Sequence, residues 1–434
     1  MPTLSRPRPA KLTLLEVFGV LAPPAGAHGV GAGVFGFLTT RDARALRLVC
    51  RLCCADVAAA RWLDVETAIT GSLEAWRACF PDAHAANVEG RNDLTDADFA
   101  RLAGVRTLDM GDCTGITGAG LAHLRGIHTL YMWGCTGITD AGLAHLRGIH
   151  TLIMCECTGI TDTGLAHLRG IHTLDMSDCT LITNAGLSHL GGIHTLNMSE
   201  CTEITDAGLA HLTGIHTLDM ERCTGITDAG FAHLTGIHTL IMCECTGITD
   251  AGFAHLSGIH TLNMWDCSGI TDAGLAPLRG IHTLNLRACA QITNAGLAHL
   301  RGINTLNMRG CAQIANAGLA HLRGIHTLNM RGCAQITDAG LAHLRGIHTL
   351  DMRECPDITG AGLAHLRGIR TLKLDRIQLG LVRRMLGLER RHWITDACSL
   401  LLRGIYTLVL GVHKLCAIAS QPLAYFLGLF TTAD

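Results

Sequence analysis

A repeat of 22 residues governs the pattern of apolar and polar positions from about Leu108 to Leu374. The unit is close to GLAHLRGIHTLDMSDCTGITDA, and one apolar anchor recurs at every 22nd position without a slip. The anchors are Met110, Met132, Met154, Met176, Met198, Met220, Met242, Met264, Leu286, Met308, Met330, Met352 and Leu374. Fixed self-similarity of this length predicts a solenoid, in which similar short coils stack because none can bury its apolar face alone.

Each unit contains the signals of a strand, a turn and a short helix. Leu130 and Met132 alternate with outward residues, as a strand with one buried face requires. Thr139 and Asp140 are favourable helix N-cap residues, and apolar residues three positions apart follow them. Gly148 then ends the helix, because glycine accepts the left-handed conformation that follows a helix C-terminus. We therefore expect one strand and one short helix per coil.

The pattern I-x-x-L-x-M-x-x-C-x-x-I-T-D resembles the cysteine-containing leucine-rich repeat, whose pattern is L-x-x-L-x-L-x-x-C-x-x-I-T-D. The match recurs about a dozen times over more than half of the chain, and its cysteines run from Cys113 to Cys355. The resemblance implies a right-handed α/β horseshoe with a parallel sheet on its concave face. Because this unit is a few residues shorter than the family's, we expect shorter helices on the convex side and an altered curvature.

The repeat register also divides the chain. It breaks after Leu374 and resumes around Leu410, which indicates a net insertion of 14 residues and one last repeat. The expected parts are a poorly defined segment at 1–33, short helices at 34–67, an N-terminal cap at 68–106, the repeats at 107–374, an insertion at 375–393, and the last repeat with a C-terminal cap at 394–434.

Composition narrows the class of protein. Hydrophobic residues make up 48% of the 434 residues but aromatic residues only 4%, so the core must be aliphatic. The formal net charge of −2 gives no global reason to expect nucleic acid or a membrane as partner. Twelve of the 20 cysteines follow the repeat, which indicates a structural position rather than disulfide pairing.

The chain shows no apolar run of about 18 or more residues, so we expect no transmembrane helix. Arg6, Arg8 and Lys11 precede an apolar stretch and faintly resemble a secretory signal, but Glu16 interrupts the stretch. A ladder of unpaired thiols also favours a reducing compartment. The expected location is the cytosol or the nucleus.

The residues immediately before and after each anchor point away from the core, and they vary from coil to coil. We call these two columns the strand face. Its predicted target-binding residues are Tyr131, Trp133, Asp175, Asp219, Glu221, Trp265, Arg287, Arg309, Arg331 and Arg353. The four arginines lie in consecutive coils and should repel one another, so an acidic partner would stabilise them best. Because the earlier coils carry acids, the face suits an extended protein ligand of complementary charge. Alternatively, the charges only keep a long sheet soluble.

Two histidine columns, which begin at His123 and His128, recur at the repeat period. Neighbouring imidazoles could bind a transition metal, but positions that hardly change between coils are better explained as solvated repeat residues, with a loss of stability near the histidine pKa as a by-product. Cys155 and Cys243 replace outward residues in CEC, a weak metal signal. No phosphate loop, nucleophile elbow or H-E-x-x-H motif occurs. We expect no metal, no cofactor and no catalytic residue.

The helices expected at 34–67 have a different texture, with an apolar stripe at helical spacing. The stretch resembles the later part of an F-box, through Phe35, Leu38, Asp42, Leu46, Val49, Cys50, Arg51 and Trp62. The Leu-Pro that opens that motif is absent, and Cys53 stands where the motif has a tryptophan. The alternative is a helical cap that merely covers the first coil, and the two roles can coexist.

An F-box followed by cysteine-type repeats resembles the substrate receptors of SCF-type (cullin–RING) ubiquitin ligases. The resemblance implies that a Skp-type adaptor binds Phe35, Leu38, Leu46, Val49, Cys50 and Trp62. It also implies that the repeats hold a target protein and that catalysis belongs to other subunits, so the chain itself is no enzyme. The alternative is a free-standing scaffold, or an effector that masks another protein without recruiting a ligase.

Overall fold

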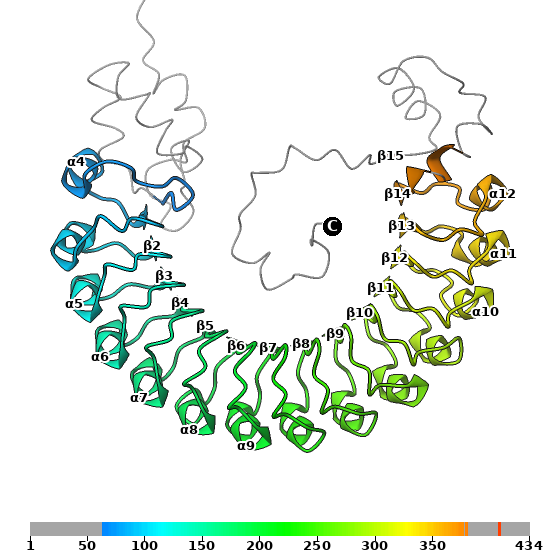
Figure 1. Cartoon of the computed structure of the whole chain (residues 1–434), viewed down its shortest axis with the longest axis horizontal. Helices are drawn as coiled ribbons and strands as arrows, with labels where there is room; N and C mark the ends of the chain where they lie inside the picture. Colours follow the sequence, from blue (N-terminus) through cyan, green and yellow to red (C-terminus); the bar gives the residue numbers. More distant parts are fainter. Residues whose placement is uncertain (1–62, 377, 381–406, 409–434) are drawn as a thin grey trace, which may run out of the picture. The chain divides into compact units, whose positions relative to one another are not determined.

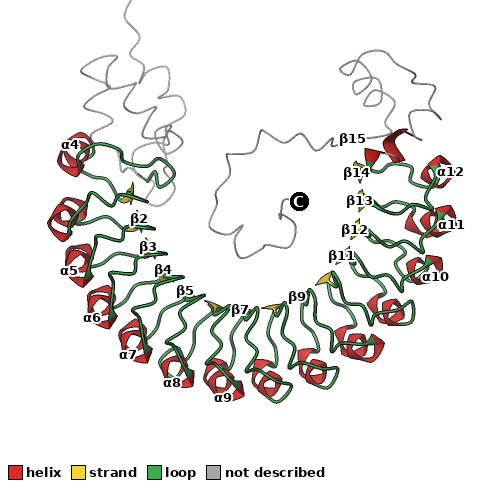
Figure 2. Cartoon of the chain, in the orientation of Figure 1, coloured by secondary structure: helices red, strands yellow, loops and turns green. Residues whose placement is uncertain are grey.

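The computed structural model describes residues 63–376, 378–380 and 407–408. The chain divides into two compact units, Met1–Cys157 and Thr158–Asp434, called unit 1 and unit 2 below. In each unit the strands line one face of the stacked coils and the short helices line the other (Figure 1, Figure 2). The strands from β1 to β14 are three residues long, and from β2 to β14 each ends at the residue before its anchor.

Unit 1 contains four described strands, and each pairs in parallel with the next along the chain. Its elements are α4 (Leu73–Cys79), β1 (Ala85–Asn87), the 3-10 helix η3 (Asp96–Leu102), β2 (Thr107–Asp109), α5 (Gly118–Leu121), η4 (Ala122–Leu124), β3 (Thr129–Tyr131), α6 (Asp140–Leu143), η5 (Ala144–Leu146) and β4 (Thr151–Ile153). The first described strand, β1, thus lies within the stretch that the sequence assigns to an N-terminal cap.

Unit 2 continues the same parallel pairing from β5 to β15. Its strands are β5 (Thr173–Asp175), β6 (Thr195–Asn197), β7 (Thr217–Asp219), β8 (Thr239–Ile241), β9 (Thr261–Asn263), β10 (Thr283–Asn285), β11 (Thr305–Asn307), β12 (Thr327–Asn329), β13 (Thr349–Asp351), β14 (Thr371–Lys373) and β15 (Thr407–Leu408). Neighbouring strands pair with a 22-residue offset, except that Thr371 pairs with Thr407. This larger offset equals one repeat plus the insertion of 14 residues.

The helical side of unit 2 consists of four-residue α-helices and short 3-10 helices. These elements are α7 (Asp162–Leu165), η6 (Ala166–Leu168), α8 (Asn184–Leu187), α9 (Asp206–Leu209), η7 (Ala210–Leu212), η8 (Gly230–Leu234), η9 (Gly252–Leu256), η10 (Asp272–Leu278), η11 (Gly296–Leu300), α10 (Asn316–Leu319), α11 (Asp338–Leu341), η12 (Ala342–Leu344) and α12 (Gly360–Leu363). The helices are as short as the 22-residue repeat predicts. In unit 1, η5 ends at Leu146 and Gly148 follows with a φ of 81°, as its glycine signal indicates.

The core consists of the apolar repeat positions. In the coil of β8, Leu240, Met242, Cys245 and Ile248 are all fully buried, which confirms the predicted aliphatic interior. The thiol of Cys245 donates to the carbonyl oxygen of Met220 at 3.1 Å, and burial raises its pKa to about 12. A protonated, hydrogen-bonded thiol is a poor nucleophile, so the cysteine ladder is structural.

The I-T-D motif connects consecutive coils, in addition to the helix-capping role of its threonine. The carboxylate of Asp228 accepts from the backbone N–H of Thr249 at 2.8 Å and from its hydroxyl at 2.6 Å, and Thr249 belongs to the next coil. The expectation that the aspartate serves as an N-cap is therefore corrected: Thr139 is the N-cap of α6, and Asp140 is the first residue of that helix.

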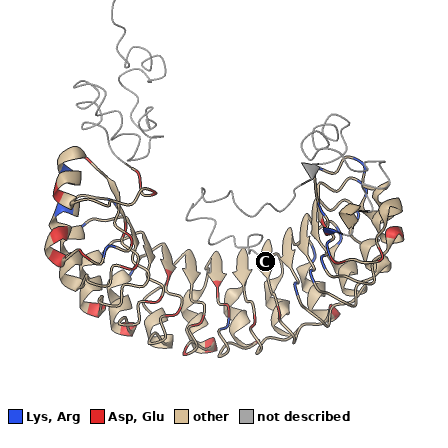
Figure 3. Ribbon diagram, turned by 45° about the horizontal axis from the view of Figure 1, so that its top comes forward, with Lys and Arg blue, Asp and Glu red and all other residues tan. Residues whose placement is uncertain are grey.

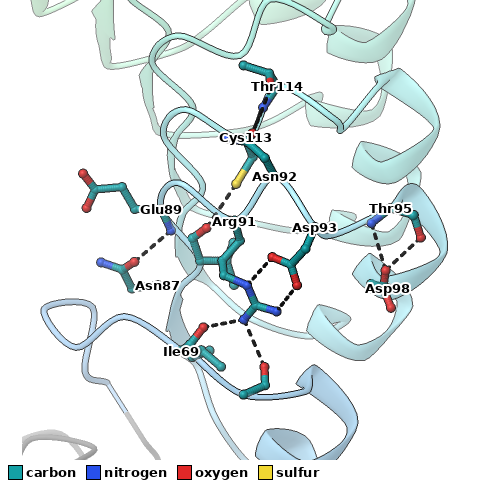
Figure 4. A network of polar contacts seen from close by, with 12 residues as sticks. Ile69, Asn87, Glu89, Arg91, Asn92, Asp93, Thr95, Asp98, Cys113 and Thr114 are labelled. Atoms are coloured by element: carbon teal, nitrogen blue, oxygen red, sulfur yellow. Dashed lines mark hydrogen bonds and ion pairs between the residues drawn. The ribbon is translucent and has the colours of Figure 1, made fainter.

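Polar contacts around Arg91 fasten the first strand of unit 1 to the chain before it (Figure 4). The Arg91 guanidinium forms two hydrogen bonds with Asp93, at 2.6 and 2.7 Å. It also donates to the carbonyl oxygens of Ile69, at 2.5 Å, and Gly71, at 3.0 Å. These bonds satisfy the backbone carbonyl groups of Ile69 and Gly71.

Candidate interaction face

The ten predicted target-binding residues are distributed over both units. Tyr131 and Trp133 belong to unit 1, and the remaining eight belong to unit 2. All are half-buried except Asp175, which is buried. The outward parity that the sequence predicts therefore leaves most of these side chains partly accessible, but none of them projects fully into solvent.

Asp175 is only 7% exposed, which corrects the expectation that every predicted target-binding residue points away from the core. Its Oδ1 accepts from the backbone N–H of Ser177 at 3.0 Å and from the hydroxyl of Ser177 at 2.8 Å. Asn285 makes the same bond to the N–H of Arg287 at 3.0 Å. The Asp or Asn before the anchor thus closes a local turn, as these short side chains commonly do. Many side chains in the column before the anchor therefore have a structural role.

In unit 1 the strand face combines aromatic rings with acids. The indole of Trp133 lies so close over Gly111 that a Cβ there would overlap the ring nitrogen. Asp109 on β2 pairs in register with Tyr131 on β3. Burial, and to a lesser degree the nearby Glu89, raises the pKa of Asp109 to about 6, and burial also raises the pKa of Tyr131.

Arg222, which is not among the predicted target-binding residues, divides the acidic part of unit 2. Arg222 donates to Glu200 at 2.6 Å and to Glu244 at 2.9 Å, so one cation bridges the coils on both sides of its own. The signal was present in the repeat alignment, since Arg222 interrupts a column of acids that includes Glu200 and Glu244.

Asp219 and Glu221 differ from Glu200 and Glu244, because no cationic side chain pairs with them in the described residues. In the part of unit 2 that the structure describes, no arginine, lysine or histidine forms an ion pair with either carboxylate. Burial raises the pKa of Asp219 to about 7. Burial also raises the pKa of Glu221, where repulsion from Glu244 and Glu200 opposes the attraction of Arg222. A carboxylate with a raised pKa lacks a positive neighbour strong enough to offset its desolvation.

Three of the four arginines in the predicted column have a side-chain partner within the protein. Arg287 lies over the ring of Trp265, with the guanidinium carbon 4.6 Å from the ring centroid. The two other pairs in this part of unit 2 join Arg331 to Glu354 at 2.6 Å and Arg353 to Asp351 at 2.7 Å.

Arg309 differs from the other three arginines. Among the described residues, its guanidinium has no ion pair, no ring contact and no hydrogen bond. Burial, together with the neighbouring Arg331 and Arg287, lowers its pKa. The residues that follow Arg287, Arg309 and Arg331 are Ala288, Gly310 and Gly332, where earlier coils carry acids. Arg309 is therefore a cation with no acid in direct contact among the described residues.

The CEC cysteines do not form a metal site in the described residues. Cys243 is only 1% exposed, which corrects the expectation of an outward thiol, and Cys155 is half-buried. Burial raises the pKa of Cys243, with Glu221 and Asp219 adding to the effect. Within residues 63–376, no cluster of three histidine, cysteine or acidic side chains has the arrangement of a metal site.

The histidine column before the strands stacks ring on ring, which the sequence did not reveal. From His172 to His282, six imidazoles in consecutive coils have centroids 4.5 to 4.6 Å apart and nearly parallel planes. Burial, and then the adjacent rings, lower the pKa values of His216 and His260. A lowered pKa favours the neutral ring, so this contribution to stability exists above the unfolded-state pKa of about 6.5 and decreases as the pH falls through it. The expected loss of stability in mild acid stays a prediction.

Asp219 should produce the opposite pH dependence, because its folded-state pKa lies above the unfolded value. Ionisation of the folded protein above pH 7 then costs stability, and this cost disappears as the pH falls below the unfolded pKa of about 4. We expect Asp219→Asn to raise the free energy of unfolding at pH 8.5 by about 2 kcal/mol and to have little effect at pH 4. Urea titrations at both pH values measure the difference. The control is Glu203→Gln, which removes an exposed acid; equal behaviour of the two variants would contradict the prediction.

Several predicted features fall on residues that the structure does not describe. All six adaptor-binding residues lie outside the described residues, namely Phe35, Leu38, Leu46, Val49, Cys50 and Trp62. So do residues 381–406 and 409–434, which contain most of the predicted insertion and last repeat.

No family model matches the chain, and no curated protein matches it in sequence. Among solved structures, the chain is similar to an internalin (inlF) from Listeria monocytogenes, with a TM-score of 0.51 and 22% identity over 78% of this chain and 96% of that one. Other similar structures are the Rad7–Elc1 complex of yeast, with a TM-score of 0.48 and 15% identity over 63% of this chain and 83% of that one, and the Drosophila Toll–Spätzle complex, with a TM-score of 0.49 and 14% identity over 71% and 49%.

The stacked coils and the likeness to the internalin define the class: the chain has the leucine-rich-repeat solenoid fold. The predicted fold class is thereby confirmed for the repeats. None of the described helices has the length and apolarity needed to cross a membrane.

Proposed function

We propose that this chain is a non-catalytic protein-interaction module whose strand face binds an extended segment of a target protein. The observation that supports the proposal is the contrast between the two sides of each coil. The buried positions repeat almost unchanged, whereas the column after the anchor changes from Glu221 through Trp265 to Arg309 within one unit. Constant residues build a scaffold, and variable half-buried aromatic and charged residues are the kind that dominate binding energy at interfaces.

In its finer form, the proposal makes the chain the substrate-recognition subunit of an SCF-type ubiquitin ligase. The support is the resemblance of residues 34–67 to an F-box, directly ahead of cysteine-type repeats. The F-box-like segment would bind a Skp-type adaptor, and the repeats would hold the target near a ligase that other subunits supply. Such a subunit contributes by bringing reactants together rather than by chemistry of its own.

A free-standing scaffold or masking effector is the second candidate, and adaptor binding separates the two. We would titrate purified full-length protein with a Skp-type adaptor in a calorimeter, beside a variant that carries Leu46→Asp and Val49→Asp. The matched control is Leu181→Asp, because Leu181 is a leucine of unit 2 that is already 53% exposed.

Binding by the parent protein and the control, but not by the double variant, would support the ligase assignment. No binding by any of the three proteins would exclude that assignment and leave the scaffold. Circular dichroism of the three proteins shows whether the double variant keeps its repeats folded.

A further inference from the structure

Charge is strongly segregated along unit 2. Residues 158–278 contain 13 acidic and two basic residues, whereas residues 279–376 contain 12 basic and five acidic residues. The same separation is visible in Figure 3, where blue segments gather over the last described coils. A ligand that follows the strand face of unit 2 therefore meets a negative region first and a positive region afterwards.

Contacts within the protein leave two positions of the strand face where half-buried charges have no ion pair in the described residues. In the negative region, Arg222 pairs with Glu200 and Glu244, and the half-buried acids of the strand face without an ion pair in the described chain are Asp219 and Glu221. In the positive region, two of the four strand-face arginines form ion pairs and Arg287 lies over a ring, so Arg309 is the one of these four without a side-chain partner in the described chain. If solvation were the sole purpose of these charges, they would be fully exposed; Glu221 and Arg309 are instead half-buried.

The spacing of the two positions follows from the sheet. Asp219 ends β7 and Arg309 follows β11, and the five strands from β7 to β11 pair consecutively. Four strand intervals at about 4.8 Å place the two positions about 19 Å apart. An extended peptide advances about 3.3 Å per residue, so it covers that distance in about six residues.

The strand-face residues between them include an aromatic ring and no acid. The intervening residues of the column after the anchor are Cys243, which is buried, and Trp265 with Arg287 over its ring. An aromatic ring stacked by a guanidinium offers a flat contact area rather than a counter-ion.

We propose that the strand face of unit 2 selects an extended protein segment that carries a cationic side chain and an anionic side chain about six residues apart. The cation lies against Asp219 and Glu221, the anion lies against Arg309, and the residues between them cross Trp265. This inference rests on the proposed protein-binding role of the strand face and specifies the chemistry of the partner.

The test uses full-length protein and fluorescent peptides, with anisotropy measured at low ionic strength. Each peptide carries a Lys-Lys pair and an Asp-Asp pair in a Ser/Thr/Ala background, separated by two, four, six, eight or ten residues. We expect the tightest binding near six residues and about tenfold weaker binding at two and ten, since one lost charge contact is worth about 1.4 kcal/mol. Equal affinity at all separations, or no binding by any peptide, would overturn the proposal.

Variants test the two ends separately. Glu221→Gln and Arg309→Gln should each weaken binding of the peptide with the six-residue separation about tenfold. Glu203→Gln and Arg301→Gln change exposed charges off the strand face and should leave this binding unchanged. A charge-reversed variant, Glu221→Arg, should come to prefer a peptide in which a second Asp-Asp pair replaces the Lys-Lys pair.

Loss of affinity in the control variants equal to that in the strand-face variants would also overturn the proposal, because non-specific attraction would then suffice. The adaptor titration is independent of these peptides. A failure of the peptide test with adaptor binding intact therefore refutes the ligand chemistry and not the ligase assignment.

Discussion

Replacement of Leu240 by alanine is expected to lower the free energy of unfolding by about 3 kcal/mol. Leu240 is the central residue of β8, is completely buried, and pairs in register with Leu218 on one side and Leu262 on the other. Removal of its side chain leaves a cavity that two adjacent coils share and that a closely packed stack cannot collapse to fill. Urea titration followed by circular dichroism measures the change.

The matched control is Leu181→Ala, in which the same atoms are removed from an exposed side chain. We expect this control to change the free energy of unfolding by less than about 0.5 kcal/mol. An equally small effect at Leu240 would mean that the coils do not depend on one continuous core. Asp219 lies on β7, which pairs with the strand of Leu240. If Leu240→Ala unfolds this coil, the protein should no longer discriminate among the peptides by the separation of their charges.

Asp228→Ala should cost about 2 kcal/mol, although its carboxylate lies at the surface of the helical side rather than in the core. The substitution removes both acceptors that hold Thr249 of the next coil, so a backbone N–H and a hydroxyl lose their charged partner at once. The same urea titration measures the effect.

The chain itself supplies the control for this substitution. Asn184 occupies the equivalent position, where it accepts from the N–H of Thr205 at 2.9 Å and donates to its hydroxyl at 2.8 Å. Asp228→Asn should therefore retain the contact between coils and cost less than about 1 kcal/mol. If the alanine and asparagine variants were equally stable, the I-T-D motif would not act as a clamp between coils.

The sequence alone determined the repeat period, the strand and helix within each coil, the aliphatic core and the leucine-rich-repeat fold. These features are predictable because they depend on local spacing: Leu130 and Met132 must face inward together, and a glycine such as Gly148 must follow each helix. Repetition multiplied each weak local signal about a dozen times, so chance could not explain the pattern.

Only the tertiary structure decided which side chains on the strand face are available to a ligand. The repeat pattern predicted that Asp175 and Cys243 point outward, but both side chains are buried, and Asp175 closes a turn. Likewise, the arginine column could be counted from the sequence, but not the partner of each arginine. Arg331 pairs with Glu354, from the next coil, whereas Arg309 pairs with no acid in the described chain.

The physical reason is that these outcomes depend on distances between residues of different coils. Stacking brings positions about 22 apart into contact, as in the ion-paired bridge from Arg222 to Glu200 and Glu244 and in the stacked ladder of imidazoles. Rotamers, ring stacking and ion pairs are settled there by competition among neighbours, which a linear pattern does not encode. The period fixed which residues become neighbours, and packing decided which of them neutralise one another.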